Sequence, residues 1–213
     1  MIDFHFAPTP NGWKVAILLE ELELPYNVVA MNLADGDQFR PEFEKISPGN
    51  RIPAIVDHDV AGAPVPVFES GAIMLYLAEK TGKFLSSEPM QRKETLEWMF
   101  WQVGSQGPMA GQHSHFWNYA PEHQRGGYAA ERYRNEYMRC IDVVDRRLEG
   151  RTWIAGSEYS IADMICWPWM LIAKAMGVPL NDYPRVAEWR SRVKERPAVQ
   201  RAVSLGREQA AAG

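Results

Sequence analysis

The sequence predicts an α/β unit of element order βαβαββα followed by a domain built only of helices. Strand-like and helix-like stretches alternate as far as residue 84, and beyond residue 90 the apolar residues follow a helical period. Between them, Gly82–Pro89 (G-K-F-L-S-S-E-P) is typical of an exposed linker. We therefore expect an α/β domain over residues 1–84, a linker over 85–90 and an all-helical domain over 91–213.

The first domain contains short strand-like runs separated by turns and helical stretches. Its last two strands flank a short polar turn, which indicates a hairpin and therefore a mixed sheet. The expected strands are Ile2–Phe6, Tyr26–Asn32, Ala54–Asp57 and Val65–Phe68, and the expected helices are Asn11–Leu24, Pro41–Ile46 and Ser70–Thr81.

The second domain is predicted to consist of long helices. One start is especially well marked, because Ser160 and Asp163 have the spacing of a capping box. Gly177 is expected to end this helix. We interpret the capping motif as structural. The expected helices begin near Gln91, Ala129, Ser160 and Pro184.

The composition excludes several classes of protein. The net charge of −4 and the lack of a basic cluster argue against nucleic acid or an anionic membrane as partner. The sequence shows neither a secretory signal nor an apolar run long enough to span a bilayer. Cys140 and Cys166 are far apart, which favours a reducing compartment, the cytoplasm by default. His113 and His115 have no evident third ligand, so no metal is expected.

The segment Ala7–Lys14, A-P-T-P-N-G-W-K, joins the first strand to the first helix. If Thr9 or Asn11 caps that helix, unpaired N–H groups and the positive end of the helix dipole face whatever lies before it. Such an end binds anions. The alternative is a well-capped helix in an ordinary turn, with Pro10 near its first position.

Two further segments offer groups to a peptide-like ligand. A cis Ile52–Pro53 bond would leave the Ile52 backbone to pair with an extended peptide, whereas a trans proline would only open an edge strand. Ser70 is placed to cap the next helix, where it would bind a carboxylate, and Glu69 would hold an ammonium group beside it. The alternative for this pair is plain capping. Together, the three segments fit a short peptide that has a free α-amino acid end and a reactive anion.

With these segments the chain resembles the glutathione transferases, in which a thioredoxin-like domain precedes an all-helical one. The stretches N-R-I-P-A-I-V-D, F-E-S-G-A-I-M-L-Y-L and Y-S-I-A-D-M-I-C-W-P-W occur in the family's order. Within the family, A-P-T-P-N-G-W-K and F-W-Q-V-G-S-Q-G-P-M-A-G-Q resemble the bacterial Nu class. The chain has neither the cysteine nor the tyrosine that other classes place near the first strand. The resemblance therefore implies that the sulfur of glutathione itself is the nucleophile.

The resemblance also implies a role for each matching residue. Thr9 and Asn11 would contact the glutathione sulfur as the catalytic pair, and Ile52 would pair with the cysteinyl backbone of the ligand. Arg132 would reach the site from the partner subunit of a homodimer; the alternative is a charge on the surface of a helix. The implied glutathione-binding residues are Gln38, Arg51, Ile52, Glu69, Ser70 and Arg132.

The function implied by the resemblance is glutathione-dependent reduction of disulfide bonds, with reduction of organic hydroperoxides and weak transferase activity beside it. One alternative is a conventional transferase that conjugates glutathione to electrophiles. Another is a glutathione-binding regulatory scaffold without catalysis. The aromatic residues Trp98, Trp101, Phe116 and Trp117 line either a second ligand pocket or ordinary core.

Overall fold

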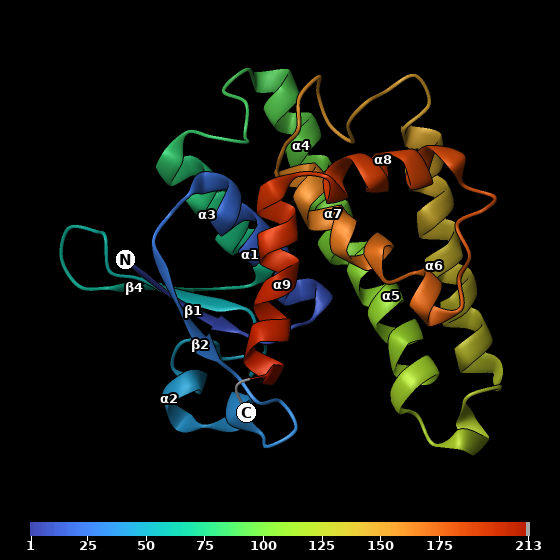
Figure 1. The fold of residues 1–213 in the computed structure, drawn as a ribbon, viewed down its shortest axis with the longest axis horizontal. Helices are drawn as coiled ribbons and strands as arrows, with labels where there is room; N and C mark the ends of the chain where they lie inside the picture. The colour runs from blue at the N-terminus through green and yellow to red at the C-terminus, as the bar shows by residue number, and fades with distance from the viewer. Residues whose placement is uncertain (212–213) are drawn as a thin grey trace. The chain divides into compact units, whose positions relative to one another are not determined.

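The computed structural model describes the backbone of residues 1–211 and the side chains of residues 1–206 (Figure 1). Its contacts divide the chain into two compact units. One contains Met1–Leu85 and the segment from Glu195 onward, and the other contains Ser86–Lys194. The domain boundaries inferred from the sequence stay predictions, and the structure adds that the last helix belongs to the first unit.

The first unit has the predicted order of strands and helices. A single turn of 3₁₀-helix, η1 (Asp37–Phe39), precedes α2, and β2 ends two residues earlier than expected. Helix α1 ends at Leu22 because Glu23 turns into the left-handed region at φ 55°. The elements are β1 (Ile2–Phe6), α1 (Pro10–Leu22), β2 (Tyr26–Ala30), α2 (Pro41–Glu44), β3 (Ala54–Asp57), β4 (Val65–Phe68) and α3 (Ser70–Thr81).

The four strands form one mixed sheet in the order β2-β1-β3-β4. Strand β1 pairs in parallel with β2 and antiparallel with β3, and β3 pairs antiparallel with β4, as expected of a hairpin. Alternate residues of β1 are buried, so Phe4 and Phe6 enter the core that α1 and α3 complete. The fully buried side chains of this core include Phe4, Phe6, Ile17, Leu18, Ile55, Ile73, Met74 and Leu77.

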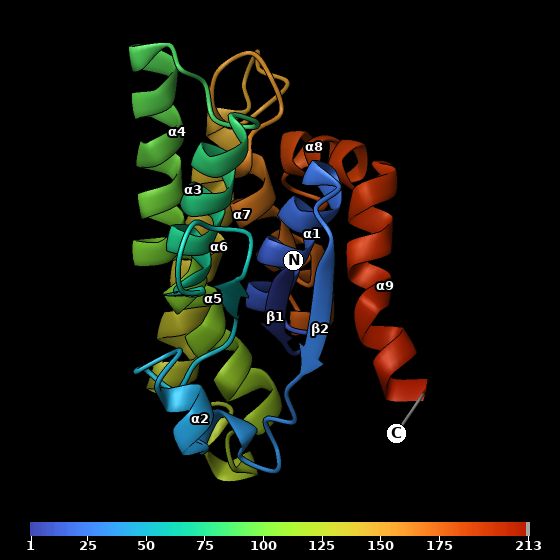
Figure 2. The ribbon, with the colours of Figure 1, turned by 90° about the vertical axis from the view of Figure 1, so that its left-hand side faces the viewer.

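The last helix, α9 (Pro197–Ala211), lies beside α1 in both views of the fold (Figures 1 and 2). Arg196 donates two hydrogen bonds to the Glu21 carboxylate at 2.6 and 2.8 Å, and Glu21 is only 8% exposed. Arg201 pairs with Glu20 at 2.6 Å. These pairs fix α9 on α1, because a two-pronged arginine–carboxylate contact sets both distance and orientation.

The second unit is helical throughout its regular structure. Helix α4 runs through a π-helical turn into α5, and a second π-helical turn, η3 (His115–Tyr119), follows. Helix α7 ends at Leu171, before the expected end at Gly177, and a short 3₁₀ turn, η5 (Lys174–Met176), fills the interval. The remaining helices are α4 (Pro89–Trp101), α5 (Gly107–Ser114), α6 (Tyr128–Arg147), α7 (Ile161–Leu171) and α8 (Pro184–Lys194).

The start of α7 confirms the capping box. The Ser160 hydroxyl accepts from the Ala162 N–H, and the Asp163 carboxylate accepts from the Ser160 N–H at 3.1 Å. Asp163 is fully buried and also accepts from the Ile154 N–H and the Trp189 indole N–H. Burial raises the pKa of Asp163 to about 6, so the carboxylate is charged at pH 7 and these donors stabilise it.

Within residues 1–211, no helix has both the length and the apolar character that crossing a membrane requires. Both cysteines are buried in the helical unit, and neither forms a disulfide. Burial raises the pKa of Cys140 to about 11, which makes its thiol a poor nucleophile at neutral pH.

Candidate functional site

Thr9 caps helix α1. Its backbone is extended, with φ −121° and ψ 161°, and its Oγ1 accepts a hydrogen bond from the Gly12 N–H at 3.2 Å. Its carbonyl accepts from the Trp13 N–H at 2.9 Å, and Pro10 fills the first helical position, where no N–H is needed. Of the two cap residues considered, the structure therefore selects Thr9 and places Asn11 in the first turn.

Two features of this cap could act on a ligand: the proton of the Thr9 hydroxyl and the positive end of the α1 dipole. The Thr9 hydroxyl accepts from the helix, and its own proton has no acceptor among the described residues. The first turn of α1 also contains no acidic side chain, so no negative residue there offsets the positive end of the helix. A hydroxyl donor beside an uncompensated helix end is suited to an anion such as a thiolate.

The turn before β3 contains a cis Ile52–Pro53 peptide bond, which decides between the two alternatives left open by the sequence. Side chains brace this turn from both sides: the Ser47 hydroxyl donates to the Arg51 carbonyl at 2.8 Å, and Asn50 Nδ2 donates to the Gln38 carbonyl at 2.9 Å. Ile52 is half-buried and Arg51 is exposed. The turn is thus tied to η1, which contains Gln38.

The prediction that Ser70 caps α3 is wrong. The N-cap is Glu69, whose carbonyl accepts from the Ile73 N–H at 2.9 Å, and Ser70 is the first helical residue. The helix begins at this point because the chain turns sharply at Glu69, which has φ 69° and ψ 119°. The Ser70 side chain is buried and hydrogen-bonds to none of the described residues, while Glu69 is exposed.

The strand register brings these three segments to one end of the sheet. His5 of β1 pairs with Ala54 of β3, and Ala54 pairs in turn with Phe68 of β4. The end of β1, the start of β3 and the end of β4 are therefore neighbours. Each leads directly to or from a candidate: Thr9 follows β1, Ile52 precedes β3, and Glu69 follows β4. Arg132 belongs to the helical unit, where it is exposed on α6.

Two features near Thr9 could not be found from the sequence. Gly206 of α9 packs so closely on Pro8 that an added Cβ would lie 2.2 Å from the Pro8 Cβ. The last helix therefore supports the loop that presents Thr9. The Trp13 indole N–H is buried without a hydrogen-bond partner among the described residues. A neutral ring at this position adds no charge to the first turn of α1.

Comparison with known proteins identifies the class. A family model described as the glutathione S-transferase N-terminal domain matches residues 1–79, and the corresponding C-terminal model matches residues 127–192. The chain belongs to the glutathione S-transferase family, with a thioredoxin-like N-terminal domain and a helical C-terminal domain. The predicted fold and family are confirmed.

Particular relatives are closely similar. The disulfide-bond oxidoreductase YfcG of Escherichia coli is 53% identical over 205 residues, which cover 95% of this chain and 94% of that protein. A glutathione transferase from Pseudomonas putida, solved with one glutathione disulfide per subunit, has 40% identity and a TM-score of 0.89, covering 96% and 91% of the two chains. One from Burkholderia graminis, with two glutathione molecules per subunit, has 39% identity and a TM-score of 0.91, covering 96% and 88%.

A metal site is a separate question. Across the described residues, no group of three or more His, Cys, Asp and Glu side chains is arranged to hold a metal ion. His113 is instead engaged structurally, with Nε2 at 2.9 Å from the Met176 carbonyl.

Proposed function

We propose that this protein reduces disulfide bonds with glutathione, whose bound thiolate serves as the nucleophile. The observation that carries the proposal is the Thr9 hydroxyl, which caps α1 through its oxygen and keeps its proton for an acceptor. The name of the E. coli relative and the glutathione species bound to the two structural neighbours support it. The buried cysteines offer no competing nucleophile.

The reaction takes two thiol–disulfide exchanges. In the first, the glutathione thiolate attacks one sulfur of the substrate disulfide, the S–S bond breaks, and the other sulfur leaves as a thiolate that takes up a proton. In the second, another glutathione thiolate attacks the glutathione sulfur of the mixed disulfide. The products are glutathione disulfide and the second substrate thiol, so the substrate gains two electrons and two glutathiones are oxidised.

The site must favour the thiolate over the thiol. A thiol of pKa near 8.5 is mostly protonated at neutral pH. Lowering that pKa by about two units requires roughly 2.7 kcal/mol of preferential stabilisation. A helix end supplies only about 0.3–1 kcal/mol. A hydrogen bond to a charged acceptor adds about 1.5–3 kcal/mol, so a donor from Thr9 or Asn11 closes the gap.

The rest of glutathione would extend along the same end of the sheet. In the proposal, the Ile52 backbone pairs with the cysteinyl residue, and Glu69 and Ser70 hold the γ-glutamyl end. Gln38 and Arg51 add contacts from the braced turn before β3. The Ser70 hydroxyl suits this role because none of the described residues engages it.

A homodimer in the cytoplasm is part of the same proposal. Arg132 is exposed on α6 and pairs with no carboxylate in the described part of the chain, which suits a residue that reaches a partner subunit. Reduction of organic hydroperoxides and weak conjugation of electrophiles would draw on the same thiolate.

The test is a double substitution, Thr9→Ala with Asn11→Ala, assayed with glutathione and a small model disulfide. We expect kcat/KM to fall by more than about 100-fold, since both donors to the sulfur are lost. The double variant should still bind glutathione, through Ile52 and Ser70. Unchanged disulfide reduction would overturn the mechanism. Faster turnover of an aryl halide than of the disulfide by the unmodified protein would favour a conjugating transferase, and glutathione binding without turnover would favour a scaffold.

A further inference from the structure

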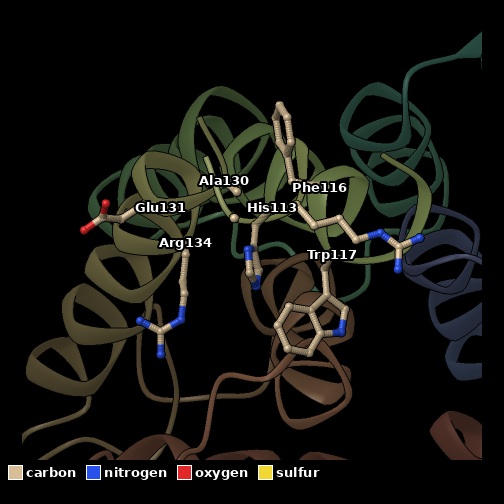
Figure 3. A pocket seen from close by; sticks show the side chains of 8 residues that line it. His113, Phe116, Trp117, Ala130, Glu131 and Arg134 are labelled. Atoms are coloured by element: carbon tan, nitrogen blue, oxygen red, sulfur yellow. The ribbon is translucent and has the colours of Figure 1, made fainter. Parts of the chain in front are cut away.

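The helical unit contains a pocket of about 300 Å³ at the ends of α5 and η3, facing the start of α6. This volume is at the small end of the range for ligand-binding pockets, about 300–1,000 Å³. His113 lies between Arg134 and Trp117, and the three side chains extend in the same direction (Figure 3). Phe116 also lines the pocket, but its ring stacks on Tyr133 at 5.8 Å.

Trp117 presents a fixed aromatic surface. Its side chain is exposed, at 46%, yet its indole N–H donates to the Ala175 carbonyl at 3.2 Å. On another side the ring packs over Gly177, where an added Cβ would lie 2.5 Å from the ring. An exposed tryptophan that is held in one orientation loses little entropy when a second ring stacks on it.

Arg134 brings a positive charge to the pocket. The residue is half-buried, and its guanidinium pairs with no carboxylate in the described part of the chain. The Glu131 carboxylate points away from His113 and Trp117 (Figure 3). Burial lowers the pKa of His113 and the charge of Arg134 lowers it further, while the hydrogen bond with the Met176 carbonyl opposes the shift. A second guanidinium, that of Arg125, donates to the Ala120 and Asn118 carbonyls and forms no ion pair within the described residues.

This pocket differs from the proposed glutathione site. Arg132, the α6 residue assigned to glutathione, precedes Arg134 by two positions. Successive residues of an α-helix are about 100° apart, so the two arginines leave α6 on nearly opposite sides. The pocket is therefore not explained by the glutathione chemistry.

We propose that this pocket binds a small planar aromatic carboxylate, with its ring on Trp117 and its carboxylate on Arg134. A flat ring matches the fixed indole face, and a planar carboxylate matches the fork of donors that a guanidinium presents. An apolar ring without the acid would leave Arg134 unpaired.

The probe is 1-naphthoate, with 1-naphthalenemethanol as its neutral counterpart. Binding is measured by calorimetry on the full protein saturated with glutathione, which blocks the proposed glutathione site. We expect 1-naphthoate to bind at least about tenfold more tightly than the alcohol, because the alcohol lacks the charge-assisted hydrogen bonds. Arg134→Gln should weaken 1-naphthoate binding about tenfold and leave the alcohol unaffected.

Two further variants complete the test. Arg139→Gln removes one positive charge from an exposed site of the same helix and should leave binding unchanged, which separates local pairing from net charge. Trp117→Leu should weaken both probes. Equal affinity for acid and alcohol, or no effect of Arg134→Gln, would overturn the proposal. So would binding of 1-naphthoate that occurs only when glutathione is absent.

Discussion

Two helices of this chain begin at a capping hydroxyl residue, Thr9 at α1 and Ser160 at α7. At α7 the first turn contains Asp163, a buried carboxylate that accepts from the Ser160 N–H, the Ile154 N–H and the Trp189 indole. Each of these donors is paired inside the protein. The negative charge also offsets the positive end of the helix.

At α1 the equivalent third position is Gly12, and the first turn has no acidic residue. Among the described residues, the Thr9 hydroxyl proton has no acceptor, and no first-turn acid offsets the positive helix end. The two starts therefore share the capping mechanism and differ in what completes it. A first-turn acid completes a structural start from within the protein, and its absence marks a start that an external anion can complete.

The largest expected effect comes from removing Asp163 at the start of α7. Asp163→Ala would leave the Ile154, Ser160 and Trp189 donors buried without an acceptor. We expect the free energy of unfolding at pH 7 to fall by about 3–5 kcal/mol, measured by denaturant titration. Asp142→Ala is the matched control, because the Asp142 side chain is 44% exposed on a helix and pairs with Arg146; the change should cost less than about 1 kcal/mol. Equal losses in the two variants would contradict the comparison.

Removing the Thr9 hydroxyl at the start of α1 should affect activity more than stability. Thr9→Val keeps the shape of the side chain and removes the hydroxyl. We expect kcat/KM for disulfide reduction to fall by about 10–100-fold, the effect of losing one hydrogen bond to a charged sulfur. Loss of the cap should lower stability by only about 1 kcal/mol. Thr9→Ser retains cap and donor and should retain both properties. A Thr9→Val variant that is destabilised but fully active would show that Thr9 is a structural cap.

A smaller effect is expected from giving α1 an acid in its first turn, as α7 has in Asp163. Asn11→Asp places an acid in the first turn of α1, where none exists. The helix should gain about 0.3–1 kcal/mol of stability from the dipole. The same charge opposes a neighbouring thiolate, so the thiol pKa of bound glutathione should rise by at least about half a unit. Thiolate absorbance followed across pH measures that pKa, and a gain in stability with no change in the pKa would place the sulfur elsewhere.

How far the sequence predicts this protein depends on how local each signal is. The bounds of α3 and the capping box of α7 were predictable because their determinants lie within a few residues. For the cap of α3 the sequence favours Ser70, whereas the structure has Glu69, whose positive φ has no signal in the neighbouring residue types.

Other features depend on contacts between distant segments and have no local signal. Gly206 supports Pro8 from the far end of the chain, and Trp117 is fixed by Ala175 and Gly177. Neither contact leaves a periodicity or a motif in the sequence. The same limit applies to the pocket beside Arg134, which exists only once α5, η3 and α6 are packed.

The smallest expected effect is a pH dependence in the segment that precedes α7. Glu94 of α4 accepts from the Gly156 N–H at 2.7 Å and pairs with Arg147, so it holds that segment in place. Burial tends to raise the pKa of Glu94, but the Gly156 hydrogen bond and Arg147 outweigh it, and the pKa is lowered from its usual 4.5. The unfolded chain therefore takes up the proton first as the pH falls. The stabilisation is complete above the unfolded pKa and is lost as the pH falls through the lower folded pKa.

Glu94→Gln should remove this dependence. At neutral pH the variant should be about 1 kcal/mol or less below the unmodified protein in stability. The difference in stability should shrink as the pH falls below the pKa of the carboxyl in the unfolded chain, because the unmodified protein then loses the same interaction. Denaturant titrations between about pH 3 and 7 give both curves. Parallel curves would mean that Glu94 contributes no proton-linked stability, and the cap of α7 would then rest on Ser160 and Asp163 without support from Glu94.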